Sequence, residues 1–124
     1  MLRITRGDDK SFGVTLPGAP NLTGCTVFFT VKPEDLVDKV DTDDSNAVIK
    51  AQESVHDHPA ADPANGKTVI SLTAAVTGGP KAVPGEYVYD IQLKDSGGKI
   101  RTYKRSNGEL PRCQITPEVT QRTT

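Results

Sequence analysis

Two histidines and two cysteines are the residues of this chain that could most readily perform catalysis or bind a metal. His56 and His58 lie two positions apart and could share a metal ion on an extended segment. No cysteine or third histidine lies near them, and prolines flank them, so the sequence favours exposed loop histidines over a metal site. A nucleophilic pair of a histidine with Cys25 or Cys113 is disfavoured, because the cysteines fall in strand-like segments and the histidines in a loop.

The two cysteines leave two alternatives open. Their spacing matches no zinc pattern, and a free cysteine is commonly a buried core residue, which favours two buried thiols. A disulfide between Cys25 and Cys113 would close a long loop and stabilise the fold by roughly 4 to 5 kcal/mol. An intermolecular bridge is the other form that a disulfide could take, and synthesis in the cytosol argues against both.

An acidic stretch runs from Glu34 to Asn46. Its last six residues, Asp41 to Asn46, offer oxygen atoms at alternating positions, as a calcium loop does. The sixth position is not glycine, and the twelfth is Gln52 where a calcium loop has glutamate. The sequence therefore favours a solvated acidic loop and predicts no metal site.

Basic residues gather near the C-terminal end of the chain. We interpret them either as a solvated strand face or as a docking face for an acidic protein surface, such as the 34–44 stretch of a neighbouring copy. Nucleic acid is a weaker candidate partner, because no aromatic residues are interleaved with the charges and the formal net charge is −1. The docking face would consist of Lys99, Arg101, Lys104, Arg105 and Arg112.

Motifs of the common enzyme classes are missing from the sequence. There is no Gly-x-Ser-x-Gly, no phosphate-binding loop and no dinucleotide fingerprint. The sequence therefore predicts a protein that is not an enzyme and that uses no cofactor. It contains no apolar run of about 18 residues and no apolar signal-peptide core, so we expect neither a membrane span nor secretion.

The element that organises the chain is the segment 84–93. Pro84 and Gly85 predict a turn, and Tyr87, Tyr89, Ile91 and Leu93 then recur at every second position, which is the period of a strand with one buried face. The four residues after it, Asp95 to Gly98, predict a hairpin into a partner strand.

Other segments of similar length also alternate, and turn residues separate them. Eleven glycines and nine prolines divide the chain into short pieces. The first strand is expected to be one edge strand interrupted by a turn or bulge at Gly7, and the Arg6-Gly7-Asp8 tripeptide is expected to be a coincidence. The sequence thus predicts an all-β, antiparallel Ig-like β-sandwich of about seven to eight short strands. We expect a single domain over 1–119 and a polar tail over 120–124.

Four segments together carry a resemblance to a known family. They are Ile4-Thr5-Arg6-Gly7-Asp8-Asp9, the segment Leu22 to Lys32, the segment Ala64 to Thr73, and the segment Pro84 to Ile91. In this order they resemble small bacteriophage and prophage virion proteins related to the N-terminal domain of siphophage upper baseplate proteins.

The resemblance implies a β-sandwich that acts by protein–protein contacts in a tailed-phage particle. Its expected place is the tail or baseplate, as an assembly or fibre-adaptor subunit. The alternative is a decoration (cement) protein on the phage capsid. Its expected partners are other virion proteins and further copies of itself, with no nucleic acid and no membrane. It would be made in the host bacterial cytoplasm and end up in the virion.

Overall fold

A computed structural model of the chain describes residues 2–16, 21–36, 45–54, 65–103 and 111–117. Strands make up most of these ranges, as the sequence predicts. The elements are β1 (Leu2–Thr5), β2 (Lys10–Thr15), β3 (Thr26–Lys32), the 3-10 helix η1 (Glu34–Leu36), β4 (Ile49–Ser54), β5 (Lys67–Leu72), α1 (Ala74–Thr77), β6 (Gly85–Lys94), β7 (Ile100–Tyr103) and β8 (Arg112–Thr116). No helix in the described ranges is long and apolar enough to cross a membrane.

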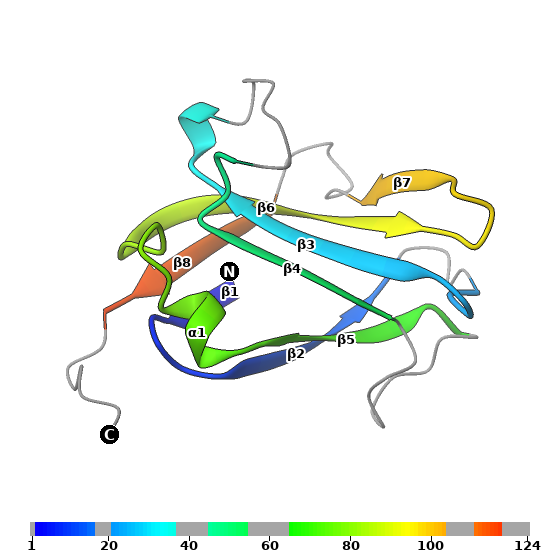
Figure 1. Ribbon diagram of the computed structural model, residues 1–124, viewed down its shortest axis with the longest axis horizontal. Helices are drawn as coiled ribbons and strands as arrows, with labels where there is room; N and C mark the ends of the chain where they lie inside the picture. The colour runs from blue at the N-terminus through cyan, green and yellow to red at the C-terminus, as the bar shows by residue number, and fades with distance from the viewer. Residues whose placement is uncertain (1, 17–20, 37–44, 55–64, 104–110, 118–124) are drawn as a thin grey trace.

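The strands form two sheets that pack face to face (Figure 1). The larger sheet has the order β1-β8-β6-β3-β4, with β7 also paired to β6, and the smaller sheet consists of β2 and β5. Immunoglobulin-type sandwiches also have the second and fifth strands in one sheet and the third, sixth and seventh in the other. Here the first and fourth strands, β1 and β4, belong to the larger sheet. The prediction of an all-β Ig-like sandwich is confirmed.

The N-terminal segment changes sheets, which corrects the prediction of one interrupted edge strand. β1 pairs in parallel with β8 in the larger sheet, and β2 pairs antiparallel with β5 in the smaller one. The chain crosses between the sheets at Gly7, whose φ of 83° lies in the left-handed region that favours glycine. The break in the sequence pattern is therefore a corner of the sandwich.

β7 and β8 lie end to end along one edge of β6. Tyr103 is opposite Ile91, and Arg112 is opposite Val88. The seventh strand of the sandwich is thus split into two pieces, which the sequence predicted as two separate strands. The predicted hairpin between β6 and β7 is confirmed.

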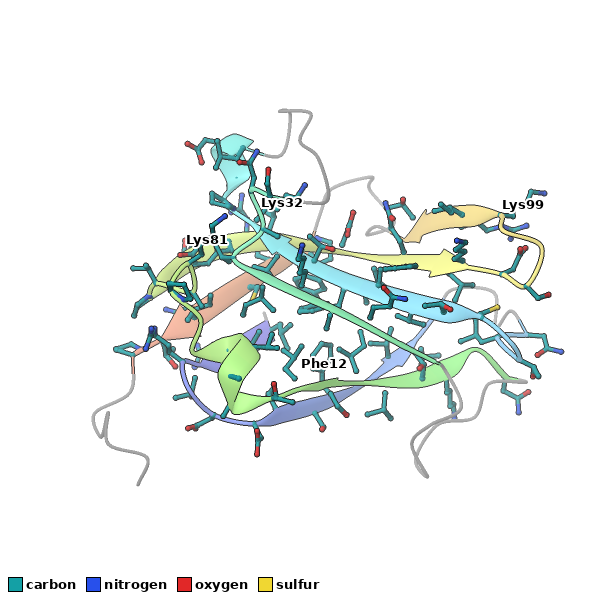
Figure 2. All side chains as sticks on the ribbon, viewed as in Figure 1. Phe12, Lys32, Lys81 and Lys99 are labelled. Atoms are coloured by element: carbon teal, nitrogen blue, oxygen red, sulfur yellow. The ribbon has the colours of Figure 1, made fainter. Side chains whose placement is uncertain are left out.

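The core lies between the sheets and is built by the inward faces of alternating strands. Phe29 of β3 is 1% exposed, and its ring lies 5.3 Å from the ring of Phe12 and 5.3 Å from that of Tyr89. Figure 2 shows Phe12 on the smaller sheet pointing toward the larger one. Burial of one such side chain contributes about 1.5 to 3 kcal/mol, so contacts of this kind hold the two sheets together.

The start of β6 is fixed by its own tyrosine. The hydroxyl of Tyr87 donates a 2.6 Å hydrogen bond to the backbone carbonyl of Val83, across the Pro84-Gly85 turn. A tyrosine that bonds back to the chain just before its strand is typical of the corner that leads into the sixth strand of Ig-type sandwiches. This bond sets where the chain enters the central strand.

Candidate functional site

The described members of the predicted basic docking face lie at separate places on the sheet. Arg101 is opposite Leu93 and Arg112 is opposite Val88, on the same edge of β6. Five residues of strand separate these positions, which is about 17 Å, and an odd separation places side chains on opposite faces. Two further members, Lys104 and Arg105, lie outside the described residues. Arg101 and Arg112 therefore cannot contact the same partner surface side by side.

Arg112 forms an ion pair within its own chain. Its guanidinium donates to the carboxylate of Glu34 at 2.9 and 3.3 Å, which is a bidentate contact. Glu34 follows the end of β3 and Arg112 begins β8, so the pair reaches across β6. Val88 of β6 is paired with Lys32 of β3 on one side and with Arg112 of β8 on the other. It belongs to the outer face of the sheet, yet it is only 5% exposed.

The other part of the predicted face is the β6–β7 hairpin. Lys94, Lys99, Ile100 and Arg101 are all exposed there. Figure 2 shows Lys99 at one end of the molecule, far from Lys32 and Lys81 at the other. The hairpin therefore presents cations and an exposed apolar side chain at one end of the sandwich.

Asp95 shapes this hairpin through its carboxylate. Its carboxylate oxygen accepts hydrogen bonds from the backbone N–H of Gly97 at 3.0 Å and of Lys99 at 2.9 Å. Gly98 adopts a φ of 86°, and its N–H donates to the Asp95 carbonyl. This is a three-residue turn with a left-handed glycine at its end, a standard connection between antiparallel strands.

The Arg6-Gly7-Asp8 tripeptide has a structural use in the corner between the sheets. The Arg6 guanidinium donates to the carbonyls of Gly78 and Gly79, at 3.1 and 3.4 Å, at the end of α1. The carboxylate of Asp9 accepts a 2.7 Å bond from the N–H of Ala74, at the start of the same helix. Arg6 and Asp9 thus join this corner to the two ends of α1.

The two cysteines are free and buried, so the alternative of a disulfide between them is wrong for this fold. Cys113 is opposite Tyr87, while Thr26, next to Cys25, is opposite Lys94. Tyr87 and Lys94 are seven positions apart on β6, which is about 23 Å. A disulfide needs Cα atoms within about 7 Å of each other. The alternative of two buried thiols is confirmed.

Burial makes both thiols harder to ionise. It raises the pKa of the Cys113 thiol from 9.0 to about 11. The pKa of Cys25 is also raised, chiefly by burial and further by the carboxylate of Asp95. Nucleophilic and metal-binding cysteines work as thiolates, so neither thiol is prepared for such chemistry at neutral pH.

Most of the other candidate metal ligands lie outside the residues that the structure describes. His56, His58 and the 41–44 part of the acidic stretch lie outside the described residues. Within the residues that the structure describes, no group of three or more His, Cys, Asp or Glu side chains is placed to hold a metal ion.

Two pairings that organise the surface were missed by sequence reasoning: Arg6 with α1, and Glu34 with Arg112. Both join residues more than 70 positions apart in the chain. A cap signal was present, because Thr73 precedes the short helix and its hydroxyl accepts from the N–H of Val76. The residues around Arg6 and Glu34 in the sequence do not indicate their partners, because these partners come close only through the pairing of the strands.

Comparison with known proteins gives distant structural likenesses, two of which follow. No protein-family model matches the chain, and no curated protein matches it. The PmoD soluble domain from Methylocystis sp. ATCC 49242 superimposes with a TM-score of 0.47 and 10% identity, over 92% of this chain and 77% of that one. A protein described as a putative glycoside hydrolase from Bacteroides vulgatus ATCC 8482 gives 0.41 and 12%, over 95% of this chain and 17% of that one.

Proposed function

We propose that this chain is a structural subunit of a tailed-bacteriophage virion, in the tail or baseplate, where it acts through protein–protein contacts. The proposal starts from the four segments that resemble virion proteins related to siphophage upper baseplate proteins. Its partners would be other virion proteins and further copies of the chain within the particle.

The observation that carries the proposal is the distribution of charged groups over the described residues. Arg6, Asp9, Glu34 and Arg112 are engaged in contacts within the chain. The β6–β7 hairpin, in contrast, exposes cations together with Ile100, which is 58% exposed. An apolar side chain among arginine and lysine is suited to contact with another protein, since interfaces combine an apolar centre with a polar rim.

The first experiment asks whether the protein is part of the particle. Virions of the phage or prophage that encodes the chain would be purified by density gradient and analysed by quantitative mass spectrometry. We expect its peptides at a constant ratio to the major capsid protein across gradient fractions. Loss of the peptides from the particle fractions, while capsid peptides remain, would overturn the proposal.

The second experiment locates the protein on the particle. Gold-labelled antibody against the chain would be imaged by electron microscopy on intact virions, with an antibody against the capsid protein as control. Label at the tail or its tip is the expected result. Label over the head would replace the proposal with the capsid-decoration alternative.

A further inference from the structure

β7 is an edge strand among the residues that the structure describes. It pairs with β6 on one side, and no other described strand pairs with it. Beside the turn, the N–H of Asp95 donates to the carbonyl of Lys99, which makes this a hydrogen-bonded pair. Antiparallel pairs alternate between bonded and non-bonded, so the backbone groups of Ile100 and Thr102 point away from β6. The edge thus offers two outward N–H donors and two outward carbonyls.

The side chains along this edge also alternate. Ile100 is opposite Lys94, on the outer face of the sheet, and Arg101 is opposite Leu93, on the other face. Ile100 is 58% exposed, and Lys99 and Arg101 are exposed as well. A strand added here would meet an apolar side chain on one face and a cation on the other.

We propose that the β7 edge receives an extended segment of a partner protein in which acidic and apolar residues alternate. The segment would add a strand to the larger sheet and bond to the backbone of Ile100 and Thr102. Its apolar residues would pack on Ile100, and its carboxylates would face Arg101 and Lys99. Binding of this kind takes its strength from the backbone and its selectivity from the alternating side chains.

The β7 edge of a second copy of this chain is the wrong occupant for this edge. Two β7 edges side by side would bring Arg101 and Lys99 of one copy against the same cations of the other. Like charges placed opposite each other on neighbouring strands are destabilising, and cations on an edge strand prevent sheets from joining. The same residues therefore keep copies apart and select an acidic partner.

This inference deepens the proposed function and rests on it for the existence of a partner in the particle. The binding experiment uses the isolated full chain and a synthetic peptide, and needs no virion. Binding by a protein that is absent from virions would overturn the proposed function alone. Failure to bind by a protein that is present in virions would overturn this inference alone.

The probe is a capped seven-residue peptide of alternating valine and glutamate, with a fluorophore, and affinity is measured by fluorescence anisotropy. Two further peptides carry N-methyl groups, one on every valine and one on every glutamate. If the peptide adds antiparallel to β7, its valine N–H groups donate to the edge; if it adds parallel, its glutamate N–H groups donate. Methylation removes the donors, so we expect one methylated peptide to bind at least tenfold more weakly than the other. Equal affinity of the two would overturn strand addition.

The charge requirement is tested on the protein. Arg101→Glu should weaken binding of the unmethylated peptide at least tenfold. The matched control is Arg3→Glu, because Arg3 is also exposed and lies far from Arg101. Through β8, Arg3 aligns with Glu86 of β6, and Arg101 aligns with Leu93, which is seven positions or about 23 Å further along that strand. The control should bind within twofold of the original chain. Equal weakening by both variants would overturn the site.

Hydrogen exchange measured by NMR locates the added strand directly. The amide protons of Ile100 and Thr102 are expected to exchange fast in the free protein and at least tenfold more slowly with saturating peptide. The amide of Arg101 bonds to β6 by the same alternation and serves as the internal reference. Saturation with peptide without slower exchange at Ile100 and Thr102 would overturn the proposal.

Discussion

The hydroxyl of Thr77 donates a 2.7 Å hydrogen bond to the backbone carbonyl of Asp8, and the Thr77 side chain is fully buried. This bond joins the end of α1 to the corner where the chain crosses between the two sheets. A hydrogen bond of this kind typically contributes about 0.5 to 1.5 kcal/mol to stability. The Thr77 hydroxyl therefore adds to the contacts that Arg6 and Asp9 make between this corner and α1.

Removal of that hydroxyl should destabilise the fold. Thr77→Val keeps the shape and removes this hydrogen bond, so we expect the free energy of unfolding to fall by about 0.5 to 1.5 kcal/mol. Thr77→Ser is the matched control, because it keeps the donor and loses only a methyl group. Urea unfolding followed by circular dichroism measures both variants, and a smaller loss for valine than for serine would contradict the expectation.

A close backbone approach at Gly78 gives a second prediction. A Cβ atom there would lie 3.0 Å from the Ala74 carbonyl oxygen and 3.2 Å from the Cα of Gly7, and both are backbone atoms that cannot easily move away. Gly78→Ala should therefore cost about 1 to 3 kcal/mol, as overpacking does. At Gly79 the corresponding contact is 3.5 Å, so Gly79→Ala should cost less. Thermal melts of the two variants provide the comparison.

The ion pair of Glu34 with Arg112 should contribute little stability. The two side chains are 63% and 48% exposed, and exposed pairs contribute about 0.2 to 1 kcal/mol. A double-mutant cycle with Glu34→Gln and Arg112→Gln, measured by urea unfolding, isolates this interaction energy. It should shrink in 1 M NaCl, since salt screens exposed charges. An interaction energy that salt leaves unchanged would mean that the pair does not act through charge.

Stability should fall at alkaline pH because of Cys113. Its pKa is raised from 9.0 to about 11 in the folded chain, so the unfolded chain ionises first as pH rises. The contribution of this thiol is complete below pH 9 and is lost as pH rises to about 11, with a size on the order of 2 kcal/mol. Urea unfolding at several pH values should show a shallower decline for Cys113→Ala. Identical declines for the variant and the original chain would exclude Cys113 as the cause.

Reducing agent should leave the melting temperature unchanged. The register places the two cysteines at opposite ends of β6, where no bond between them can form. Scanning calorimetry with and without dithiothreitol tests this. A drop of several degrees on reduction would mean that Cys25 and Cys113 are bridged and that the register is different.

The strands could be predicted from sequence because their signal is local. Tyr87, Tyr89, Ile91 and Leu93 repeat with the strand period, and all four pack in or against the core. The prediction did not extend to Val88, which shares a face with the polar residues of β6. Its burial depends on neighbours from β3 and β8, which the sequence of β6 does not contain.

The candidate site was harder to predict, because it depends on register. Lys99, Arg101 and Arg112 are near one another in sequence, which suggested one basic face. Two residues that pair with the same strand share a face only if their partners on that strand are an even number of positions apart. The partners of Arg101 and Arg112 on β6 are Leu93 and Val88, which are five positions apart, so the two arginines lie on opposite faces. The sheet change at Gly7 was missed for a similar reason, since β1 and β2 have the same alternation whichever sheet they join.

The parallel pairing of β1 with β8 has a mechanical consequence. Leu2 is beside Cys113 and Thr5 beside Thr116, and further bonds run from the Arg6 N–H and the Thr116 hydroxyl across the same junction. A force that pulls Leu2 and Thr116 apart would slide the two strands along each other and load all of these bonds at once. Shear of this kind resists extension better than peeling, in which bonds break one after another. The sandwich is thus built to bear tension applied between its first and last strands.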